Sequence, residues 1–325
     1  MAFPYNVYLA ALLGAALSSA LSLPAWRRWA LRAGLVDEPG HRKIHHAPVP
    51  LAGGWAVLTG VLLPLALGAL ALGLGLVPDA SAEPLSHGFR RRATQVAVLA
   101  AGALGMMLLG WWDDRHELRP ARKFAGQWLI ASGVALAGVR ITLFVPSSLF
   151  SYAITVLWLL TLVNAFNFTD NMNGLCAGLG AIAAWQFAVL AGRDGQYLVA
   201  LLALVTCGAL VGFLPWNFPR GRVFLGDAGS HLVGYLLAVL AILPHFFTAR
   251  NPRGHAVLAP LLVLAVPLVD LAQVVVSRWR RGRPVYVGDT YHLSHLLVRA
   301  GLSQSAAVLV LWAAAVVIGA IPLFW

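Results

Sequence analysis

The sequence contains little charge for its length. Only 11% of its 325 residues are Asp, Glu, Lys or Arg, whereas 60% are hydrophobic, and the mean hydropathy is +0.78. This balance excludes an ordinary soluble domain and indicates a polytopic membrane protein. The only two cysteines, Cys176 and Cys207, both fall inside apolar segments, so no disulfide framework is expected.

The sequence also lacks other organising features. It has no internal repeat, no linker between domains and no His/Cys spacing of the kind that binds zinc. We therefore expect a single domain over residues 1–325 and no zinc site.

Ten segments are apolar and long enough to cross a membrane as helices, which need about 20 residues at about 1.5 Å rise each. The expected spans cover about 5–26, 51–77, 93–112, 124–143, 148–166, 174–191, 196–214, 229–248, 255–276 and 305–324. The sequence predicts an all-α, polytopic membrane protein with about ten transmembrane helices.

The distribution of basic residues between the loops predicts the orientation. No Lys or Arg precedes the first span, and Arg27, Arg28 and Arg32 follow it, which is the reverse of a cleavable signal peptide. If the N-terminus lies outside, sixteen Lys and Arg residues fall in inside segments and seven in outside ones, three of these at 90–92. Because basic residues favour the cytoplasmic side, we expect both termini outside. The net charge of +11 is then explained by the basic residues that set the membrane topology, and no nucleic-acid partner is expected.

With this topology, every dense polar stretch lies on the cytoplasmic side. The stretches are DEPGHRKIHHAPVPLAGG (37–54), WWDDRHELRPARK (111–123), NAFNFTDNMNG (164–174), NFPRGRVFLGDAGSH (217–231) and RWRRGRPVYVGDTYHLSHL (278–296). They hold eight of the twelve acidic residues. A single active site on the cytoplasmic face is therefore predicted.

Asp113 and Asp114 lie where the third span meets the cytoplasm. Adjacent carboxylates repel each other and lose hydration there unless a cation compensates them. They could simply end a helix and pair with Arg115 or Lys123. Alternatively they form an acid–base or divalent-metal site, since Mg²⁺ takes carboxylate oxygens and keeps water and substrate phosphates as its other ligands.

The segment FLGDAGSH places Asp227 between Gly226 and Gly229, directly before the eighth span. One interpretation is a capping turn in which Asp227 or Ser230 accepts backbone N–H groups. The other is a carboxylate and a helix N-terminus presented to a phosphate or its metal ion. The two interpretations are compatible.

The asparagines Asn164, Asn167 and Asn171 have the spacing of one helical stripe about 60° wide, with Asp170 beside it. Amides hydrogen-bond between spans, which would explain the asparagines alone. A carboxylate in the same stripe favours a functional site.

Basic groups complement these acids. The last loop carries Arg280, Arg281, Arg283, His292 and His295, and the first carries Arg42, Lys43, His45 and His46. Most of the arginines are expected on the cytoplasmic face in any case. The two later histidines, at i and i+3, could share a helix face and donate to phosphate oxygens.

Together these groups describe a place where a Mg²⁺-bound diphosphate meets a lipid headgroup. A transporter of an anionic solute would instead carry charges in mid-span, and only Asp270, near Pro267, has that position. A catalytically silent scaffold would not need four aspartates at one face.

The motifs resemble those of the polyprenyl-phosphate N-acetylhexosamine-1-phosphate transferase family, which includes the phospho-N-acetylmuramoyl-pentapeptide transferases and the bacterial and eukaryotic GlcNAc-1-phosphate transferases. They run in matching order from about residue 35 to residue 303: V-D-E-P-G-H-R-K-I-H with P-x-P-x-x-G-G, D-D-R-x-x-L-x-x-x-x-K, N-A-F-N-F-T-D-N-M-N-G-L, F-L-G-D-A-G-S, P-L-x-D and D-x-x-H-x-x-H. One such motif would be weak, whereas the ordered set is specific.

The resemblance implies Mg²⁺-dependent transfer of a sugar-1-phosphate from a UDP-sugar to undecaprenyl or another polyprenyl phosphate, with release of UMP; Mn²⁺ is a possible substitute. It implies a multi-pass protein of a bacterial-type plasma membrane, and a homodimer is compatible with it. Asp227 and Asn167 would hold the metal; Asp113, Asp114, Asp170 and Lys123 would be catalytic; and Asn164, Asn173, Arg281, Arg283, His292, His295, Lys43 and His45 would bind substrate.

The sequence departs from the common family pattern in two places. Many bacterial members read T-D-G-x-D-G-L where this chain has Asn173 in place of the second aspartate, as the eukaryotic enzymes do. Ser294 stands where a histidine is common. The single-serine form HLSH is closer to the GlcNAc-1-phosphate type than to the muramoyl-pentapeptide type, which stays open as an alternative.

Overall fold

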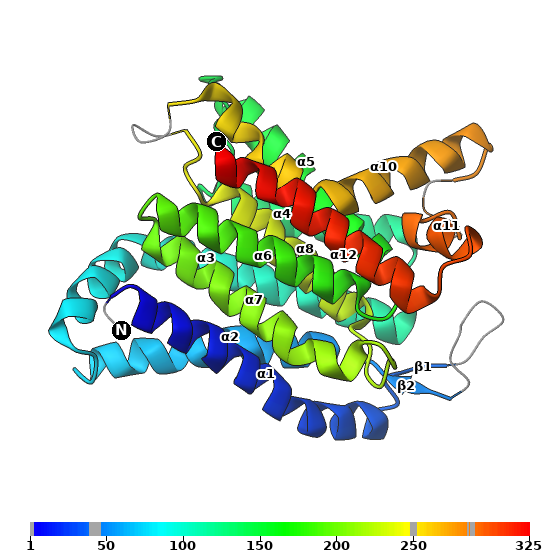
Figure 1. Ribbon diagram of the computed structural model, residues 1–325, viewed down its shortest axis with the longest axis horizontal. Coiled ribbons are helices and arrows are strands. Elements are labelled where there is room, and N and C mark those ends of the chain that lie inside the picture. Colours follow the sequence, from blue (N-terminus) through cyan, green and yellow to red (C-terminus); the bar gives the residue numbers. More distant parts are fainter. Residues whose placement is uncertain (1–2, 39–46, 248–251, 285, 287–289) are drawn as a thin grey trace.

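The computed structural model describes residues 3–38, 47–247, 252–284, 286 and 290–325 (Figure 1). The chain is mostly helical. Its helices are α1 (Tyr5–Arg32), α2 (Gly53–Gly73), α3 (Asp79–His116), α4 (Pro120–Leu136), α5 (Ser148–Thr169), α6 (Leu175–Arg193), α7 (Tyr197–Asn217), α8 (Gly226–Ile242), η1 (Gly254–Leu258), α9 (Ala259–Val263), α10 (Ala265–Arg280), α11 (Leu293–Arg299), α12 (Gln304–Ala320) and η2 (Ile321–Phe324). Two short strands, β1 (Val36–Asp37) and β2 (Val49–Pro50), complete it.

Each of the ten predicted spans overlaps a helix or a bent pair of helices. By length and composition, seven helices of the described residues could cross a membrane, and the bent pair 254–280 would make eight. The other two predicted spans correspond to α4 and α8, each only 17 residues long. An all-α polytopic membrane protein is thus confirmed, whereas the number of spans and the side on which the termini lie stay predictions.

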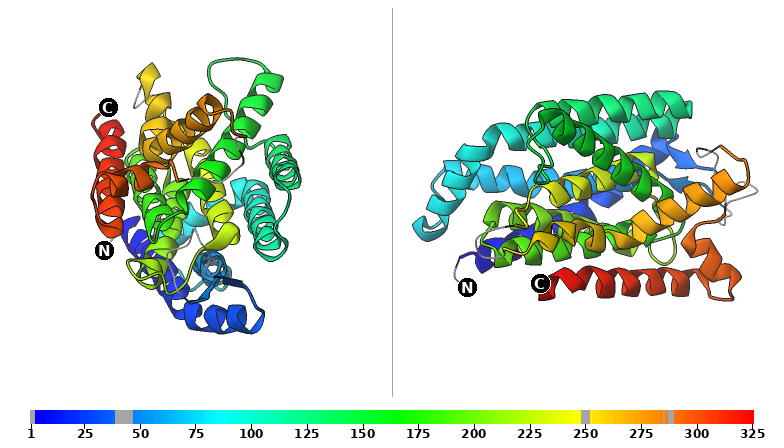
Figure 2. Two further views of the ribbon diagram at one scale, coloured as in Figure 1. Left: turned by 90° about the vertical axis from the view of Figure 1, so that its right-hand side faces the viewer. Right: turned by 90° about the horizontal axis from the view of Figure 1, so that it is seen from above.

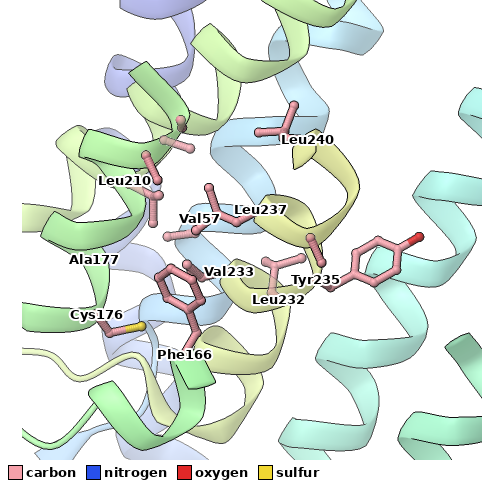
Figure 3. Close-up of a cluster of buried hydrophobic side chains, with 14 of the residues drawn as sticks. Val57, Phe166, Cys176, Ala177, Leu210, Leu232, Val233, Tyr235, Leu237 and Leu240 are labelled. Carbon is pink, nitrogen blue, oxygen red and sulfur yellow. The ribbon is translucent and has the colours of Figure 1, made fainter. Parts of the chain in front are cut away.

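Helix α8 lies inside the bundle. Its residues from Ala228 to Ala241 are buried with few exceptions, and it packs against α2, α3, α5 and α6. Figure 3 shows Leu232, Val233 and Leu237 of α8 among side chains of the neighbouring helices. A helix that is apolar on all sides is typical of such a buried position. The start of α8, with Asp227, is therefore held by several helices at once.

The ninth predicted span is broken. Helices α9 and α10 meet at Leu264 with a bend of 71°. Pro267 explains the position, because it has no N–H to donate to the carbonyl of Val263 and its ring collides with that carbonyl. Helix α10 consequently extends away from the helix bundle. Helix α12 lies at the edge of that bundle (Figure 2).

The hairpin β1–β2, the end of α10 and α11 lie at the same end of the molecule (Figure 1). The hairpin is also bonded to the segment that precedes α8. The Phe224 N–H donates to the Pro50 carbonyl over 3.1 Å, and the Gly53 N–H donates to the Phe224 carbonyl over 2.9 Å. The first polar segment is thus attached directly to the fourth.

Candidate active site

The ends of four helices, α3, α4, α5 and α8, bring Asp113, Lys123, Asn167 and Asp227 together. The Lys123 Nζ lies 2.8 Å from the Asp113 Oδ2 and 2.5 Å from the Asp227 Oδ2. The Asn167 Nδ2 donates to the Asp227 Oδ1 over 2.7 Å, and the Asn167 Oδ1 lies 3.4 Å from Nζ. Three of the five polar segments thus meet in one cluster, which we call the Asp227 cluster.

Asp114 binds the backbone at the start of α8. Its Oδ1 accepts from the Asp227 N–H over 2.7 Å and its Oδ2 from the Ala228 N–H over 3.0 Å. Gly226 has φ +69°, and a Cβ there would lie 2.7 Å from the Asp114 Oδ2, so both conformation and space require glycine. One interpretation of the sequence placed the cap on Asp227 or Ser230, but the carboxylate that accepts these N–H groups comes from α3.

Asp170 lies at the end of α5. The helix stops at Thr169, so the predicted helical stripe is wrong for Asp170 and Asn171. The stop is stabilised by Asn171, whose Nδ2 donates to the Phe168 carbonyl over 2.7 Å and satisfies a group that the helix end leaves open. Asp170 is therefore in a turn beside the Asp227 cluster rather than on the side of a helix.

The Asp170 carboxylate has no hydrogen-bond partner among the described residues. Burial raises its pKa to about 8, and the negative charges of Asp227, Asp114 and Asp37 add to this shift. Such a group gains from a cation, because a positive charge would compensate both the lost hydration and the repulsion. Asp170 is the carboxylate of the site that is best placed to accept one.

Asn164 has a packing contact. Its Nδ2 donates to the Gln127 Oε1 and to the Leu160 carbonyl, each over 2.8 Å, and so joins α5 to α4. Among the described residues, no side-chain hydrogen bond joins it to the Asp227 cluster. The structure gives it the interhelical role that the sequence left open.

The turn that carries Asn173 packs on the turn after α7. The Asn173 Nδ2 donates to the Pro219 carbonyl over 3.1 Å. Buried Asn217 joins the two turns, because its Oδ1 accepts from the Gly174 N–H over 2.5 Å and its Nδ2 donates to the Val223 carbonyl over 2.9 Å. Asn173 is thus a half-buried polar group held by two ordered turns.

Helix α11 brings the last polar segment to the same place. His292 is the N-cap of α11 in an extended conformation, so His292 and His295 do not share a helix face as predicted, although their ring centroids lie 6.1 Å apart. The Ser294 hydroxyl donates to the Asn171 Oδ1 over 2.7 Å. The Arg281 guanidinium stacks on the Tyr291 ring, 3.3 Å from its centroid, and Arg283 is exposed.

Comparisons with known proteins identify the family of this chain. Residues 96–245, which include the Asp227 cluster, match the profile of glycosyl transferase family 4. The chain is 36% identical over 327 residues to the decaprenyl-phosphate N-acetylglucosaminephosphotransferase of Mycobacterium tuberculosis, covering 90% of this chain and 77% of that one. It is 30% identical over 297 residues to the probable undecaprenyl-phosphate N-acetylglucosaminyl 1-phosphate transferase of Bacillus subtilis, covering 89% and 76%. The chain belongs to glycosyl transferase family 4.

A more distant relative fits the same family. The chain is 29% identical over 305 residues to the undecaprenyl-phosphate alpha-N-acetylglucosaminyl 1-phosphate transferase of Yersinia pestis, covering 89% of this chain and 76% of that one. The resemblance read from the motifs is thereby confirmed. The protein is a membrane-embedded phosphotransferase, and the transporter and scaffold alternatives are wrong.

This family 4 enzyme has oxygen donors suited to Mg²⁺. In the described part of the chain, no group of three His, Cys, Asp or Glu side chains is placed to hold a metal ion. Mg²⁺ does not require one, since it is usually held by one or two carboxylates, water and substrate phosphates. Each carboxylate oxygen of Asp227 has two lone pairs, so it can bind a metal ion while it accepts its present hydrogen bond. Both carboxylate oxygens of Asp170 are available to a metal ion. The residues present therefore fit a magnesium ion.

Some of the predicted site residues lie apart from the Asp227 cluster or outside the described part of the chain. Lys43 and His45 lie outside the described residues of the family 4 enzyme. Three polar residues that contribute to its site had no predicted role: Asn217, His231 and Asp270. The His231 Nδ1 lies 2.5 Å from the Asp227 carbonyl oxygen. The sequence did carry a signal for each, since Asn217 and His231 lie at the two ends of the polar stretch 217–231 and Asp270 is an acidic residue inside an apolar span.

Proposed function

We propose that this family 4 enzyme transfers GlcNAc-1-phosphate from UDP-GlcNAc to a polyprenyl phosphate in a Mg²⁺-dependent reaction. The observation that carries the proposal is the Asp227 cluster with Asp170 beside it, in a chain whose relatives are named as polyprenyl-phosphate GlcNAc-1-phosphate transferases. The products are UMP and a polyprenyl-diphosphate sugar. The active site is on the cytoplasmic face of a bacterial-type inner membrane.

In the reaction, an oxygen of the polyprenyl phosphate attacks the phosphorus that carries the sugar. The bond from that phosphorus to the bridging oxygen breaks, and UMP leaves with the bridging oxygen and its electron pair. The second pKa of a phosphate monoester is about 6, so much of the acceptor is dianionic at neutral pH without a general base. The protein mainly has to position two anions and offset their repulsion.

Lys123 supplies the positive charge for this task. Its ammonium lies between Asp113 and Asp227, which fix its position and leave it beside the proposed diphosphate. It would bind the lipid phosphate, while Asp113 holds the lysine and Asp114 holds the start of α8. Asp113 and Asp114 thus act through positioning more than through proton transfer.

The metal would be held by Asp227 and Asn167, with Asp170 next to it. A bound Mg²⁺ would neutralise charge on the diphosphate and orient it for in-line attack. The ring and amide groups at the rim, His292, His295 and Asn173, would contact the diphosphate and the uracil, and Arg281 and Arg283 would lie near the phosphates. A homodimer stays compatible with this proposal.

The sugar is proposed from the relatives' names and from HLSH at 292–295. The muramoyl-pentapeptide alternative has no comparable support. The experiment is to incubate purified protein with polyprenyl phosphate, Mg²⁺ and a panel of UDP-sugars, and to measure UMP release. We expect turnover with UDP-GlcNAc; no turnover with any UDP-sugar would contradict the proposed reaction.

A pair of variants tests the metal assignment in the same assay. Asp227→Ala should lower UMP release by more than about 100-fold, since it removes a ligand and leaves Lys123 without its closest partner. Glu117→Ala removes an exposed carboxylate from the nearby α3–α4 turn and should be nearly neutral. Near-normal activity of Asp227→Ala, with Mg²⁺ dependence retained, would remove Asp227 from the metal site.

A further inference from the structure

Asp270 and His292 form a buried pair that the proposed chemistry has not used. The Asp270 and His292 side chains are 4% and 7% exposed, and the His292 Nδ1 lies 2.8 Å from the Asp270 Oδ2. The Asp270 Oδ1 accepts from the Leu293 N–H over 2.6 Å. One carboxylate on α10 therefore holds both the ring of His292 and the first N–H of α11.

These two contacts determine where the ring proton lies. The Leu293 N–H can only donate, so Oδ1 must accept from it. An ionised carboxylate is an acceptor at both oxygens, so the His292 Nδ1 must carry a proton to bond Oδ2. This holds whether the ring is neutral or doubly protonated. The Nε2 is then the only ring nitrogen that can form a hydrogen bond with another molecule.

The second nitrogen is next to the proposed site. Among the described residues, the His292 Nε2 has no hydrogen-bond partner. The ring packs edge-on against Phe168, with centroids 5.9 Å apart, and Phe168 follows Asn167 directly and lies two residues before Asp170. The neighbouring Ser294–Asn171 hydrogen bond joins α11 to the same turn.

We propose that Asp270 is a positioning residue that keeps the proton of His292 on Nδ1 and thereby presents Nε2 to the UDP-sugar donor. The identity of that ligand rests on the proposed function; the tautomer does not. A carboxylate that orients a histidine in this way acts without touching the substrate.

The substitution Asp270→Asn tests this sharply. If the amide oxygen keeps its bond to the Leu293 N–H, the amide NH₂ faces the His292 Nδ1. That nitrogen must then lose its proton, and the proton moves to Nε2. The shape and both hydrogen bonds are retained while the tautomer is reversed.

Two measurements follow from this reversal. In protein labelled with ¹⁵N-histidine, with His292 assigned by the signals missing in His292→Asn, Nδ1 should be protonated in the wild type and unprotonated in Asp270→Asn. The kcat for UMP release should fall about 10- to 100-fold in Asp270→Asn, with the KM for the polyprenyl phosphate little changed. In the double variant Asp270→Asn/His292→Asn, activity should equal that of His292→Asn alone.

A matched control separates the positioning of the His292 ring from the docking of α11. Ser294→Ala removes another hydrogen bond that holds α11, the one to Asn171, and should leave the His292 Nδ1 protonated because the contact with Asp270 is retained. An unprotonated Nδ1 in the wild type, or a wild-type kcat in Asp270→Asn, would overturn the proposal. Absence of transfer from every UDP-sugar would overturn the proposed function instead, because the NMR result does not depend on turnover.

Discussion

At the scale of single residues, Asp170 carries a prediction about pH. Its pKa is raised to about 8 by burial and by the carboxylates of Asp227, Asp114 and Asp37. In the unfolded chain it loses its proton near pH 4. Between about pH 4 and pH 8 the folded protein therefore binds more protons at this group than the unfolded one does, and Asp170 lowers the stability as the pH rises.

We expect Asp170→Asn to remove this contribution. In detergent with EDTA, the variant should lose less stability than the wild type between pH 5 and pH 8.5, as measured by thermal unfolding. Added Mg²⁺ should stabilise the wild type more at pH 8.5 than at pH 5, because the cation binds the ionised carboxylate. An identical pH dependence in both proteins would show that Asp170 is not the group responsible.

Asp114 carries a prediction about stability. Its two oxygens accept the first N–H groups of α8, from Asp227 and Ala228. Asp114→Ala should lower the free energy of unfolding by about 1–3 kcal/mol, because buried donors lose their charged acceptor. Asp114→Asn keeps one acceptor and should lose less. Chemical unfolding measures both, and equal losses in the exposed-site control Glu117→Ala would contradict this role.

At the scale of elements, the approach of α3 to α8 carries the next prediction. A Cβ at Gly110 would collide with the carbonyl oxygen and carbon of Asp227, which are backbone atoms that cannot rotate away. Gly110→Ala should therefore push α3 and α8 apart, lower the unfolding temperature and displace Asp227 from Lys123, with at least a 10-fold loss of activity.

The same helix offers a matched control. At Gly105, one and a half turns earlier on α3, a Cβ would lie 3.4 Å from the nearest atom of Ile130, which is ordinary contact. Gly105→Ala should change stability by less than about 1 kcal/mol, and it also favours the helix. A similar outcome for the two variants, in unfolding and in UMP release, would mean that the α3–α8 contact does not position the site.

Several elements differ from the sequence-based expectation for one reason. The α5 stripe, the shared face of His292 and His295, and the cap of α8 all assumed contacts within one helix. In the structure α5 ends at Thr169, His292 precedes α11, and the α8 cap comes from Asp114. Local periodicity describes the middle of a helix well, but it does not show at which residue the helix ends or which side chain, near or distant in the sequence, binds the groups at that end.

At the scale of the whole molecule, the predicted orientation can be tested by thiol labelling. Cys176 and Cys207 are buried, so their background should be low. With the N-terminus outside, Thr142→Cys in the exposed α4–α5 loop should react with a membrane-impermeant maleimide in intact cells. Arg119→Cys, at the exposed start of α4, should react only after permeabilisation. The reverse pattern would place the active site on the outer face.

Composition and periodicity by themselves determined the class of this protein: helical, embedded in a membrane, with its polar segments gathered at one end. They could do so because lipid demands long apolar helices and allows polar groups only at their ends. The motifs added the family. Tertiary structure alone decided that Lys123 lies between Asp113 and Asp227, that Asn164 joins two helices, and that Asp270 holds His292. Those pairings join residues from 10 to 104 positions apart, and only the packing of the helices brings them within hydrogen-bond distance.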